Sequence, residues 1–210
     1  MDVAQFKKQP IMGILRGIEP DLIEPLLETV VSCGLKTVEI TMNTKGASEL
    51  IRKAVKLANK HLCVGAGTVL NMNSLKLALS SGATFVVLPT LIEDVVDYCV
   101  KNKIPVFPGA LTPGEIYKAW SRGATMVKVF PAKFLGPEYF KDIKGPFEEI
   151  ELLACSGVRP DNVEAYFYNG ASAVSFGASV FKREWLEVRD FKNIAKRITE
   201  YLQALNKCKL

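Results

Sequence analysis

The chain has 210 residues, of which 49% are hydrophobic and 23% charged, with a formal net charge of +5 at pH 7. This composition is typical of a globular protein with one substantial core, and the lysines and arginines are too scattered for a nucleic-acid-binding surface. The sequence has no run of about 18 apolar residues, and its start, "MDVAQFKKQPIMGILRG", lacks signal-peptide features, so we expect a cytoplasmic protein that does not enter a membrane.

The cysteines and the single histidine predict neither disulfides nor a metal site. His61 lies among polar residues, where a surface position is expected, and the five cysteines include no CxxC pair. An odd number of cysteines argues against a complete disulfide framework, and a transition-metal site usually needs several clustered ligands. We therefore expect no metal and no cofactor. The cysteines are Cys33, Cys63, Cys99, Cys155 and Cys208.

Short β-branched runs alternate with longer amphipathic runs every 20 to 25 residues or so, which predicts βα units around a parallel sheet. Amphipathic stretches at 21–34 and 45–60 show apolar residues at steps of three and four, as helices do. The stretch 190–207 predicts a final C-terminal helix. The predicted strands are Ile11–Leu15, Thr37–Thr41, Leu62–Ala66, Thr84–Leu88, Pro105–Pro108, Met126–Phe130, Ile150–Ala154 and Ala173–Phe176.

A recurring junction favours a (β/α)8 barrel over an open doubly wound sheet. The phrases "SCGLKTVEI", "SSGATFVVL", "SRGATMVKV" and "YNGASAVSF" each place a glycine after a helix and a strand about two residues later. Glycine at this position adopts the left-handed conformation that ends a helix. No GxGxxG motif opens the first helix, and no linker divides the chain. The sequence therefore predicts one α/β domain over residues 1–210, a (β/α)8 TIM barrel with a C-terminal helix.

The alternation of side chains in two predicted strands brings a glutamate and a lysine together. In "TVEIT" and "MVKVF" the valines and the isoleucine face the helices, which leaves Glu39 and Lys128 facing the barrel interior. These are the second and sixth strands, which contribute to the same interior layers and lie across the barrel from each other. We therefore expect Glu39 and Lys128 to meet near the barrel axis.

This pair has a structural and a functional interpretation. A buried ion pair that only fills the barrel contributes little stability, because desolvation offsets most of the attraction. In the functional interpretation, Lys128 is a nucleophile that forms a Schiff base and Glu39 carries protons. An apolar setting lowers the pKa of a lysine so that the neutral amine attacks a carbonyl, and a facing carboxylate then transfers protons.

More polar groups follow the predicted strands, at the end where barrel active sites lie. Arg16 follows the first strand and has a fork of donors suited to a carboxylate, or to a salt bridge at the rim. Thr68 follows the third strand, where Gly65 and Gly67 allow a ligand close to the backbone or serve a structural turn. The loops after the last two strands are at a frequent phosphate-binding place, which uses backbone N–H groups and a helix N-terminus. These loops contain Ser156, Gly157, Gly177, Ala178 and Ser179.

The chain resembles the 2-keto-3-deoxy-6-phosphogluconate (KDPG) aldolases, a family of class I aldolases, from about Ile11 to Phe181. The resemblance rests on "ILRG", "VEIT", "GAGTVL", "FPGALTPGE" and "VKVFPA", which occur in the family's order. It implies a homotrimeric barrel that splits a 2-keto-3-deoxy-6-phospho sugar acid into pyruvate and glyceraldehyde 3-phosphate. It also implies that Lys128 is the Schiff-base lysine, Glu39 the catalytic glutamate, and Arg16 and Thr68 the contacts of the pyruvyl carboxylate. Pro89 matches the family's proline after the fourth strand.

The chain departs from this pattern at the substrate's other end. Asn43 stands where phosphogluconate aldolases commonly have arginine, and the related 2-keto-3-deoxy-6-phosphogalactonate aldolases also have asparagine. Cys155 and Ser156 stand where the family has a threonine or bare glycines. The preferred sugar epimer and the phosphate site therefore stay open. The alternatives are a 4-hydroxy-2-oxoglutarate aldolase giving pyruvate and glyoxylate, a phosphate-sugar isomerase or synthase barrel, and a non-catalytic phosphate-binding relative.

Overall fold

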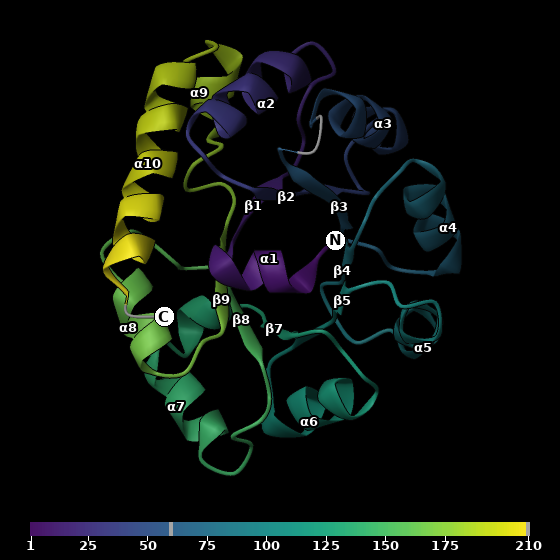
Figure 1. Ribbon diagram of the computed structural model, residues 1–210, viewed down its shortest axis with the longest axis vertical. Helices are drawn as coiled ribbons and strands as arrows, with labels where there is room; N and C mark the ends of the chain where they lie inside the picture. Colours follow the sequence, from purple (N-terminus) through teal and green to yellow (C-terminus); the bar gives the residue numbers. More distant parts are fainter. Residues whose placement is uncertain (59–60, 209–210) are drawn as a thin grey trace.

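The computed structural model describes residues 1–58 and 61–208, in which nine parallel strands form a ring surrounded by helices (Figure 1). Neighbouring strands follow the order β5-β4-β3-β2-β1-β9-β8-β7-β6. The predicted (β/α)8 barrel is therefore confirmed. The strands are β1 (Ile11–Leu15), β2 (Thr37–Thr41), β3 (Cys63–Gly67), β4 (Val86–Val87), β5 (Val106–Phe107), β6 (Gly109–Ala110), β7 (Val127–Val129), β8 (Leu152–Cys155) and β9 (Ala173–Phe176).

The nine strands correspond to the eight strands of a (β/α)8 barrel, because β5 and β6 are two pieces of one extended segment divided by Pro108. A proline has no N–H to donate to a neighbouring strand. The segment pairs with β4 on one side, where Leu88 N donates to Phe107 O at 3.0 Å. On the other side Lys128 N donates to Pro108 O at 2.9 Å, which joins the segment to β7. The chain itself thus closes the ring between β5 and β6.

Helices alternate with the strands and end as the glycine junctions predict. Gly34, Gly82, Gly123 and Gly170 have φ values of 82°, 98°, 88° and 95°, in the left-handed region that glycine adopts without a steric cost. The predicted helix at 45–60 is α3, and its residues 59 and 60 lie outside the described residues. The helices are α1 (Val3–Lys8), α2 (Ile23–Ser32), α3 (Ala47–Ala58), α4 (Met72–Ser80), α5 (Glu93–Lys101), α6 (Pro113–Ser121), the 3-10 helix η1 (Ala132–Phe134), α7 (Glu138–Lys144), α8 (Val163–Tyr168), α9 (Arg183–Glu187) and α10 (Phe191–Lys207).

Alternate side chains of the strands divide the core into two parts. Outward residues such as Val38, Ile40, Val127 and Val129 pack beneath the helices, as expected. Inward residues fill the end of the barrel that α1 covers. Phe6 of α1 packs on them, with its ring centroid 5.9 Å from that of Phe107. Figure 1 shows α1 lying across the end of the ring. The inner cluster consists of Phe6, Met12, Phe85, Val87, Phe107, Met126, Leu153 and Ala173.

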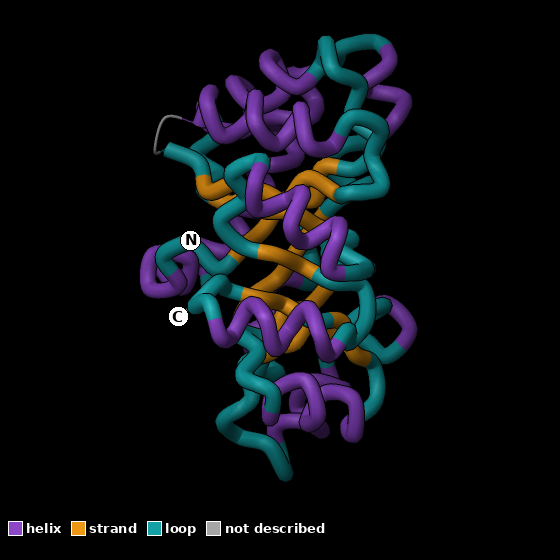
Figure 2. Tube along the Cα trace, turned by 90° about the vertical axis from the view of Figure 1, so that its right-hand side faces the viewer, coloured by secondary structure: helices purple, strands orange, loops and turns teal. Residues whose placement is uncertain are grey.

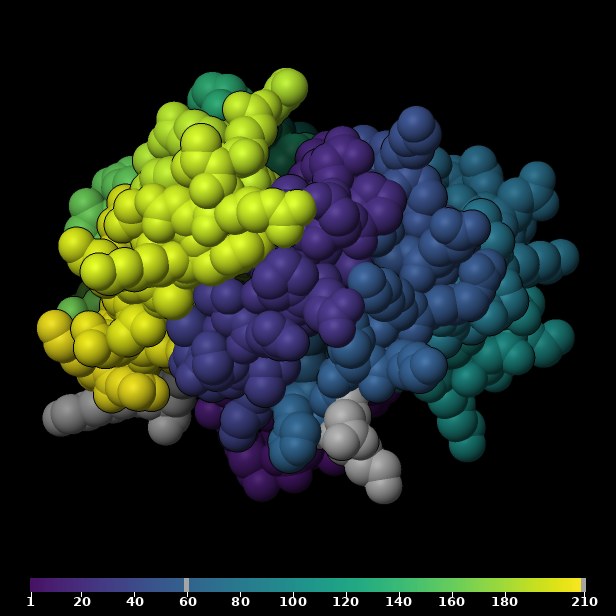
Figure 3. All heavy atoms as spheres, turned by 90° about the horizontal axis from the view of Figure 1, so that it is seen from above, coloured from purple at the N-terminus to yellow at the C-terminus, as the bar shows by residue number. Residues whose placement is uncertain are grey.

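The predicted C-terminal helix is α10, which contacts α2, α8 and α9. Figure 2 shows the strands as a central layer with helices outside them, and Figure 3 shows the yellow C-terminal segment beside the purple N-terminal one. Among the described residues, no helix is both long and apolar enough to cross a membrane. All five cysteines are free.

Candidate active site

A cavity of about 590 Å³ opens at the C-terminal ends of the strands, opposite α1. The structure brings most of the predicted site residues to its wall. The predicted residues that line it are Arg16, Thr68, Pro89, Lys128, Ser156, Gly157, Gly177, Ala178 and Ser179.

Lys128 lies on the inward face of β7 at the floor of this cavity, and only 6% of its surface is exposed. Its neighbours Val127 and Val129 point into the helix-side core, which fixes the orientation of the strand. The Phe130 ring lies over the amine, with its centroid 5.3 Å from Lys128 Nζ. An aromatic face attracts a cation and also excludes water from it. The Phe130 ring therefore covers one side of the Lys128 amine.

Glu39 lies on the inward face of β2 and is 1% exposed. Neither of its carboxylate oxygens has a hydrogen-bond partner within the described part of the chain. The ion pairs found among the described residues do not include one between Glu39 and Lys128. A buried carboxylate without partners is costly, and a pair that merely filled the barrel would be directly bonded. The geometry therefore favours the functional interpretation.

Burial and mutual attraction act in opposite directions on this pair. Burial raises the pKa of Glu39, although Lys128 and Arg16 partly oppose this effect. Burial lowers the pKa of Lys128, as expected, but the adjacent Cys155 sulfur and the Glu39 carboxylate raise it, and the net pKa is raised. The expectation of a lysine neutralised by desolvation alone is therefore wrong for the resting site. The ammonium form is favoured, so a base must take its proton before the amine attacks a carbonyl.

Two glycines of β3 make room for buried side chains, where the sequence suggested either the approach of a ligand or a structural turn. A Cβ at Gly67 would overlap the Glu39 carboxylate, and one at Gly65 would overlap the Phe85 ring. In the β2–β3 register Glu39 pairs with Gly65 and Thr41 pairs with Gly67, so the Glu39 side chain reaches one inward position further along β3 to lie against Gly67. Gly67 is therefore needed for Glu39 to fit in the barrel.

Arg16 and Thr68 meet at the rim of the cavity. Arg16 Nη2 donates a hydrogen bond to Thr68 Oγ1 at 3.2 Å. Thr68 has φ 55°, a left-handed conformation that is uncommon for a β-branched residue. Strain of this kind often occurs at functional sites. The two side chains together present a guanidinium and a hydroxyl to the cavity, which suits a carboxylate.

The other two predicted substrate contacts differ in position. Pro89 lines the cavity, and its carbonyl packs so closely on Gly109 that a Cβ there would overlap it. Asn43 is exposed in the loop after β2 and is not among the residues that line the cavity. The structure therefore brings Pro89, but not Asn43, to the site.

The loops after β8 and β9 form one side of the cavity, and β9 pairs with β1, the strand that Arg16 follows. Ser156 and Gly157 both have positive φ, 78° and 81°. Within the described residues, the backbone N–H groups of Gly157, Val158, Ala178 and Ser179 make no hydrogen bond. Converging free N–H groups bind anions. Helix N-termini contribute less than expected, because α8 and α9 begin only at Val163 and Arg183.

Two arginines of the cavity wall were not predicted from the sequence. Arg159 follows the β8 loop and Arg183 follows the β9 loop, and both line the cavity. Within the described part of the chain each has only an exposed local partner, Asp161 at 3.0 Å for Arg159 Nε and Glu187 at 2.6 Å for Arg183 Nε. A basic residue within six positions of each predicted phosphate loop is the signal that would have found them.

Inward alternation also places Cys155 and Ser175 in the cavity wall. Ser175 is 2% exposed and donates to the Ala154 carbonyl at 3.2 Å. Within residues 1–58 and 61–208, no three His, Cys, Asp or Glu side chains gather as metal ligands. The cavity wall thus carries the Lys128 amine, the Cys155 thiol and the guanidinium groups of arginines.

Comparison with known proteins links this arrangement to one family. The family model described as KDPG and KHG aldolase matches residues 3–197. The 2-dehydro-3-deoxy-6-phosphogalactonate aldolase of Escherichia coli K12 is 28% identical over 199 residues, 94% of this chain and 97% of that protein. The 2-dehydro-3-deoxy-phosphogluconate aldolase of Pseudomonas aeruginosa is 32% identical over 158 residues, 75% of this chain and 70% of that protein.

Solved structures agree with the sequence matches. A structure described as native KDPGal superposes with a TM-score of 0.88 at 27% identity, covering 94% of this chain and 95% of that one. The 2-keto-3-deoxy-6-phosphogluconate aldolase of Zymomonas mobilis superposes with a TM-score of 0.85 at 25% identity, covering 96% of each chain.

Proposed function

The chain belongs to the KDPG and KHG aldolase family, and we propose that it is a class I aldolase that cleaves a 2-keto-3-deoxy-6-phospho sugar acid to pyruvate and glyceraldehyde 3-phosphate. The observation that carries the proposal is Lys128, buried at the floor of the cavity in the same barrel interior as an unpartnered Glu39. The names of the relatives support the substrate class, since they include phosphogluconate and phosphogalactonate aldolases.

In the proposed mechanism, Glu39 first helps to remove a proton from the Lys128 ammonium group. The raised pKa of Glu39 makes it a stronger base than an exposed carboxylate. The neutral amine attacks the substrate's keto carbon to give a carbinolamine. Glu39 then gives its proton to the carbinolamine hydroxyl, so that water leaves, an iminium group forms and Glu39 is again a carboxylate. Glu39 then takes the proton of the hydroxyl at C4 as the C3–C4 bond breaks, and the iminium group accepts the electron pair. Glu39 returns the proton to C3, and water releases pyruvate.

The two ends of the cavity fit the two ends of the substrate. Arg16 and Thr68 would hold the carboxylate next to the keto carbon. The free N–H groups of the β8 and β9 loops, with Arg159 and Arg183, would hold the phosphate. Asn43 would reach substrate only if its loop moved toward the cavity. From the family resemblance we further propose a cytoplasmic homotrimer, which sedimentation would detect as a particle three times the chain's 23.1 kDa mass.

A cleavage assay tests the proposal. Purified protein is given the 6-phosphorylated gluconate- and galactonate-type substrates, which differ at C4, and the pyruvate released is measured over time. 4-Hydroxy-2-oxoglutarate, which lacks a phosphate, is assayed alongside. We expect the fastest pyruvate release from one phosphorylated epimer, and Lys128→Ala to release none. Faster cleavage of 4-hydroxy-2-oxoglutarate would favour a 4-hydroxy-2-oxoglutarate aldolase. If none of the substrates released pyruvate, the aldolase proposal would be wrong.

A further inference from the structure

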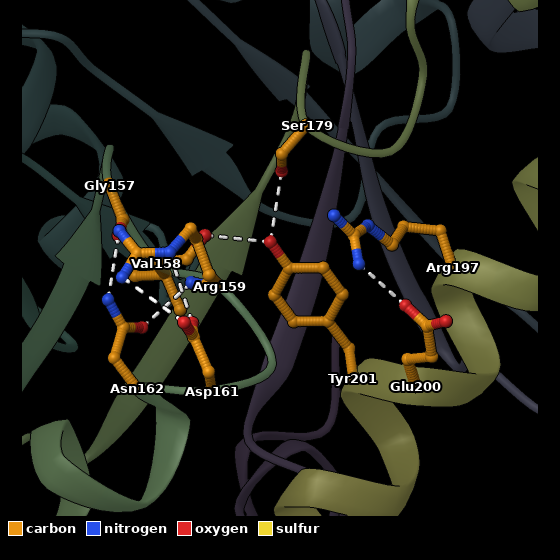
Figure 4. A network of polar contacts seen from close by, with 9 residues as sticks. All are labelled: Gly157, Val158, Arg159, Asp161, Asn162, Ser179, Arg197, Glu200 and Tyr201. Carbon is orange, nitrogen blue, oxygen red and sulfur yellow. Dashed lines mark hydrogen bonds and ion pairs between the residues drawn. The ribbon is translucent and has the colours of Figure 1, made fainter.

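A buried tyrosine on the C-terminal helix α10 connects the two cavity loops that follow β8 and β9. Tyr201 Oη donates to the Val158 carbonyl at 2.7 Å and lies 3.0 Å from Ser179 Oγ (Figure 4). Val158 belongs to the loop after β8, and Ser179 belongs to the loop after β9. One hydroxyl group on α10 thus bridges two loops that are about twenty residues apart in sequence.

We propose that Tyr201 is a positioning residue that holds these two loops at the spacing needed to bind the substrate's distal phosphate. The proposal rests on the aldolase function proposed above and deepens it. The free N–H groups of the two loops are adjacent to the bonded atoms, since Gly157 precedes Val158 and Ala178 precedes Ser179. A change in the spacing of the loops would therefore separate the donors that must converge on one anion.

The direction of the hydrogen bonds assigns a role to Ser179 as well. Tyr201 uses its only proton on the Val158 carbonyl, so Ser179 must donate its own proton to Tyr201 Oη. The Ser179 oxygen then has only lone pairs left to face the cavity, and these repel an anion. The phosphate is held by the backbone N–H of Ser179 and its neighbours, and the Ser179 side chain serves the link.

The surroundings of Tyr201 make the link rigid. The residue is fully buried, and its ring centroid lies 4.6 Å from that of Phe176. Burial raises the pKa of the Tyr201 hydroxyl, so it remains a proton donor at physiological pH. The β8 loop is braced from its other side by Asn162, whose Nδ2 donates to the Gly157 carbonyl at 3.0 Å (Figure 4). Packing and hydrogen bonds thus hold the phenol in one place.

Tyr201→Phe tests the proposal, because it keeps the packed ring and removes both hydrogen bonds. Tyr166→Phe is the matched control: Tyr166 is equally buried, at 1% exposed, and its hydroxyl makes no hydrogen bond within the described residues. KM and kcat are measured for the preferred phosphorylated substrate and for 4-hydroxy-2-oxoglutarate. We expect Tyr201→Phe to raise KM for the phosphorylated substrate about tenfold, with little change in kcat and little effect on the substrate without phosphate. Tyr166→Phe should change neither.

A double mutant separates the link from direct binding by the Ser179 hydroxyl. If Ser179 acts through Tyr201, Ser179→Ala also raises KM and adds nothing further in the Tyr201→Phe background. Effects that multiply in the double mutant would overturn the assignment of Ser179 to the link. If Tyr201→Phe does not fold, Ser179→Ala breaks the bridge alone, and its KM for the two substrates decides the question. An equal loss with both substrates, or no loss, would overturn the proposal.

Binding of inorganic phosphate distinguishes failure of this inference from failure of the aldolase proposal. Calorimetric titration of the wild type and of Tyr201→Phe needs no turnover. We expect phosphate affinity to fall about tenfold in the variant and to be unchanged in Tyr166→Phe. Equal phosphate affinity in wild type and Tyr201→Phe would overturn the inference even if the wild type proved to be an active aldolase.

Discussion

At the scale of single residues, Lys128 and Glu39 share the barrel interior and influence each other's protonation without a direct bond among the described contacts. The raised pKa of Lys128 keeps the amine protonated, and the raised pKa of Glu39 makes it ready to accept a proton. The raised pKa of Glu39 thus favours proton transfer to its carboxylate, whereas the raised pKa of Lys128 opposes loss of the amine's proton. The predictions for Glu39 follow from this coupling.

Glu39→Gln is expected to lose at least about 100-fold in the rate of cleavage while still forming the imine with pyruvate, because a positioned general base contributes about 10²- to 10⁴-fold. Steady-state cleavage and borohydride trapping are measured on the same preparation. Normal cleavage by Glu39→Gln would remove the carboxylate from the mechanism.

The same substitution is expected to stabilise the protein at neutral pH. The folded-state pKa of Glu39 is raised above its ordinary value of 4.5. The folded chain therefore binds this proton more tightly than the unfolded chain, and stability is lost as the pH rises through the folded-state pKa. Thermal melts should show Glu39→Gln above wild type at about pH 8 and close to it at about pH 4. A variant less stable than wild type at both pH values would contradict the desolvated carboxylate.

At the scale of elements, the loops after β8 and β9 and the segment containing β5 and β6 define the site. The barrel strands were predictable because a period of two distinguishes inward from outward side chains, and this placed Glu39 and Lys128 correctly. Loop conformation has no such period. Their nearness in sequence to the phosphate loops makes Arg159 and Arg183 candidates, but only the structure places them in the cavity wall and Asn43 outside it.

Arg159→Ala and Arg183→Ala are each expected to raise KM for the phosphorylated substrate several-fold and to leave pyruvate trapping unchanged, because a guanidinium contact to phosphate strengthens binding at that end alone. Lys182→Ala is the matched control, since Lys182 has the same charge beside Arg183 but packs on the Trp185 ring, 4.4 Å from its centroid. A loss as large in Lys182→Ala would mean that overall charge, and not the two arginines, attracts the substrate.

Gly109→Ala is expected to destabilise the closing segment, because its Cβ would overlap the backbone carbonyl of Pro89. Overpacking of this kind typically costs about 1–3 kcal/mol, and each kcal/mol lowers the melting temperature of a chain this size by roughly 2–4 °C. Gly114→Ala on α6 is the control, as a Cβ there meets no atom within 4 Å. Equal melting temperatures for the two variants would show that the β4–β6 contact is looser than described.

At the scale of the whole molecule, the regular spacing of strands and glycines predicted the barrel, since each βα unit repeats the same local signals. The helix α1 was not predicted, because it precedes that rhythm and only its packing against the inner cluster reveals its role. It covers the end of the barrel opposite the cavity. The lowered pKa expected for Lys128 also failed, because Cys155 and Glu39 act on it only in the folded chain.

The central claim is that Lys128 forms a covalent imine with the keto acid. Borohydride reduction in the presence of pyruvate, followed by mass spectrometry of the intact chain and its peptides, tests this directly. We expect one pyruvyl adduct per chain, located on Lys128 and absent from Lys128→Ala. An unmodified chain, or an adduct on another lysine such as Lys133, would contradict it.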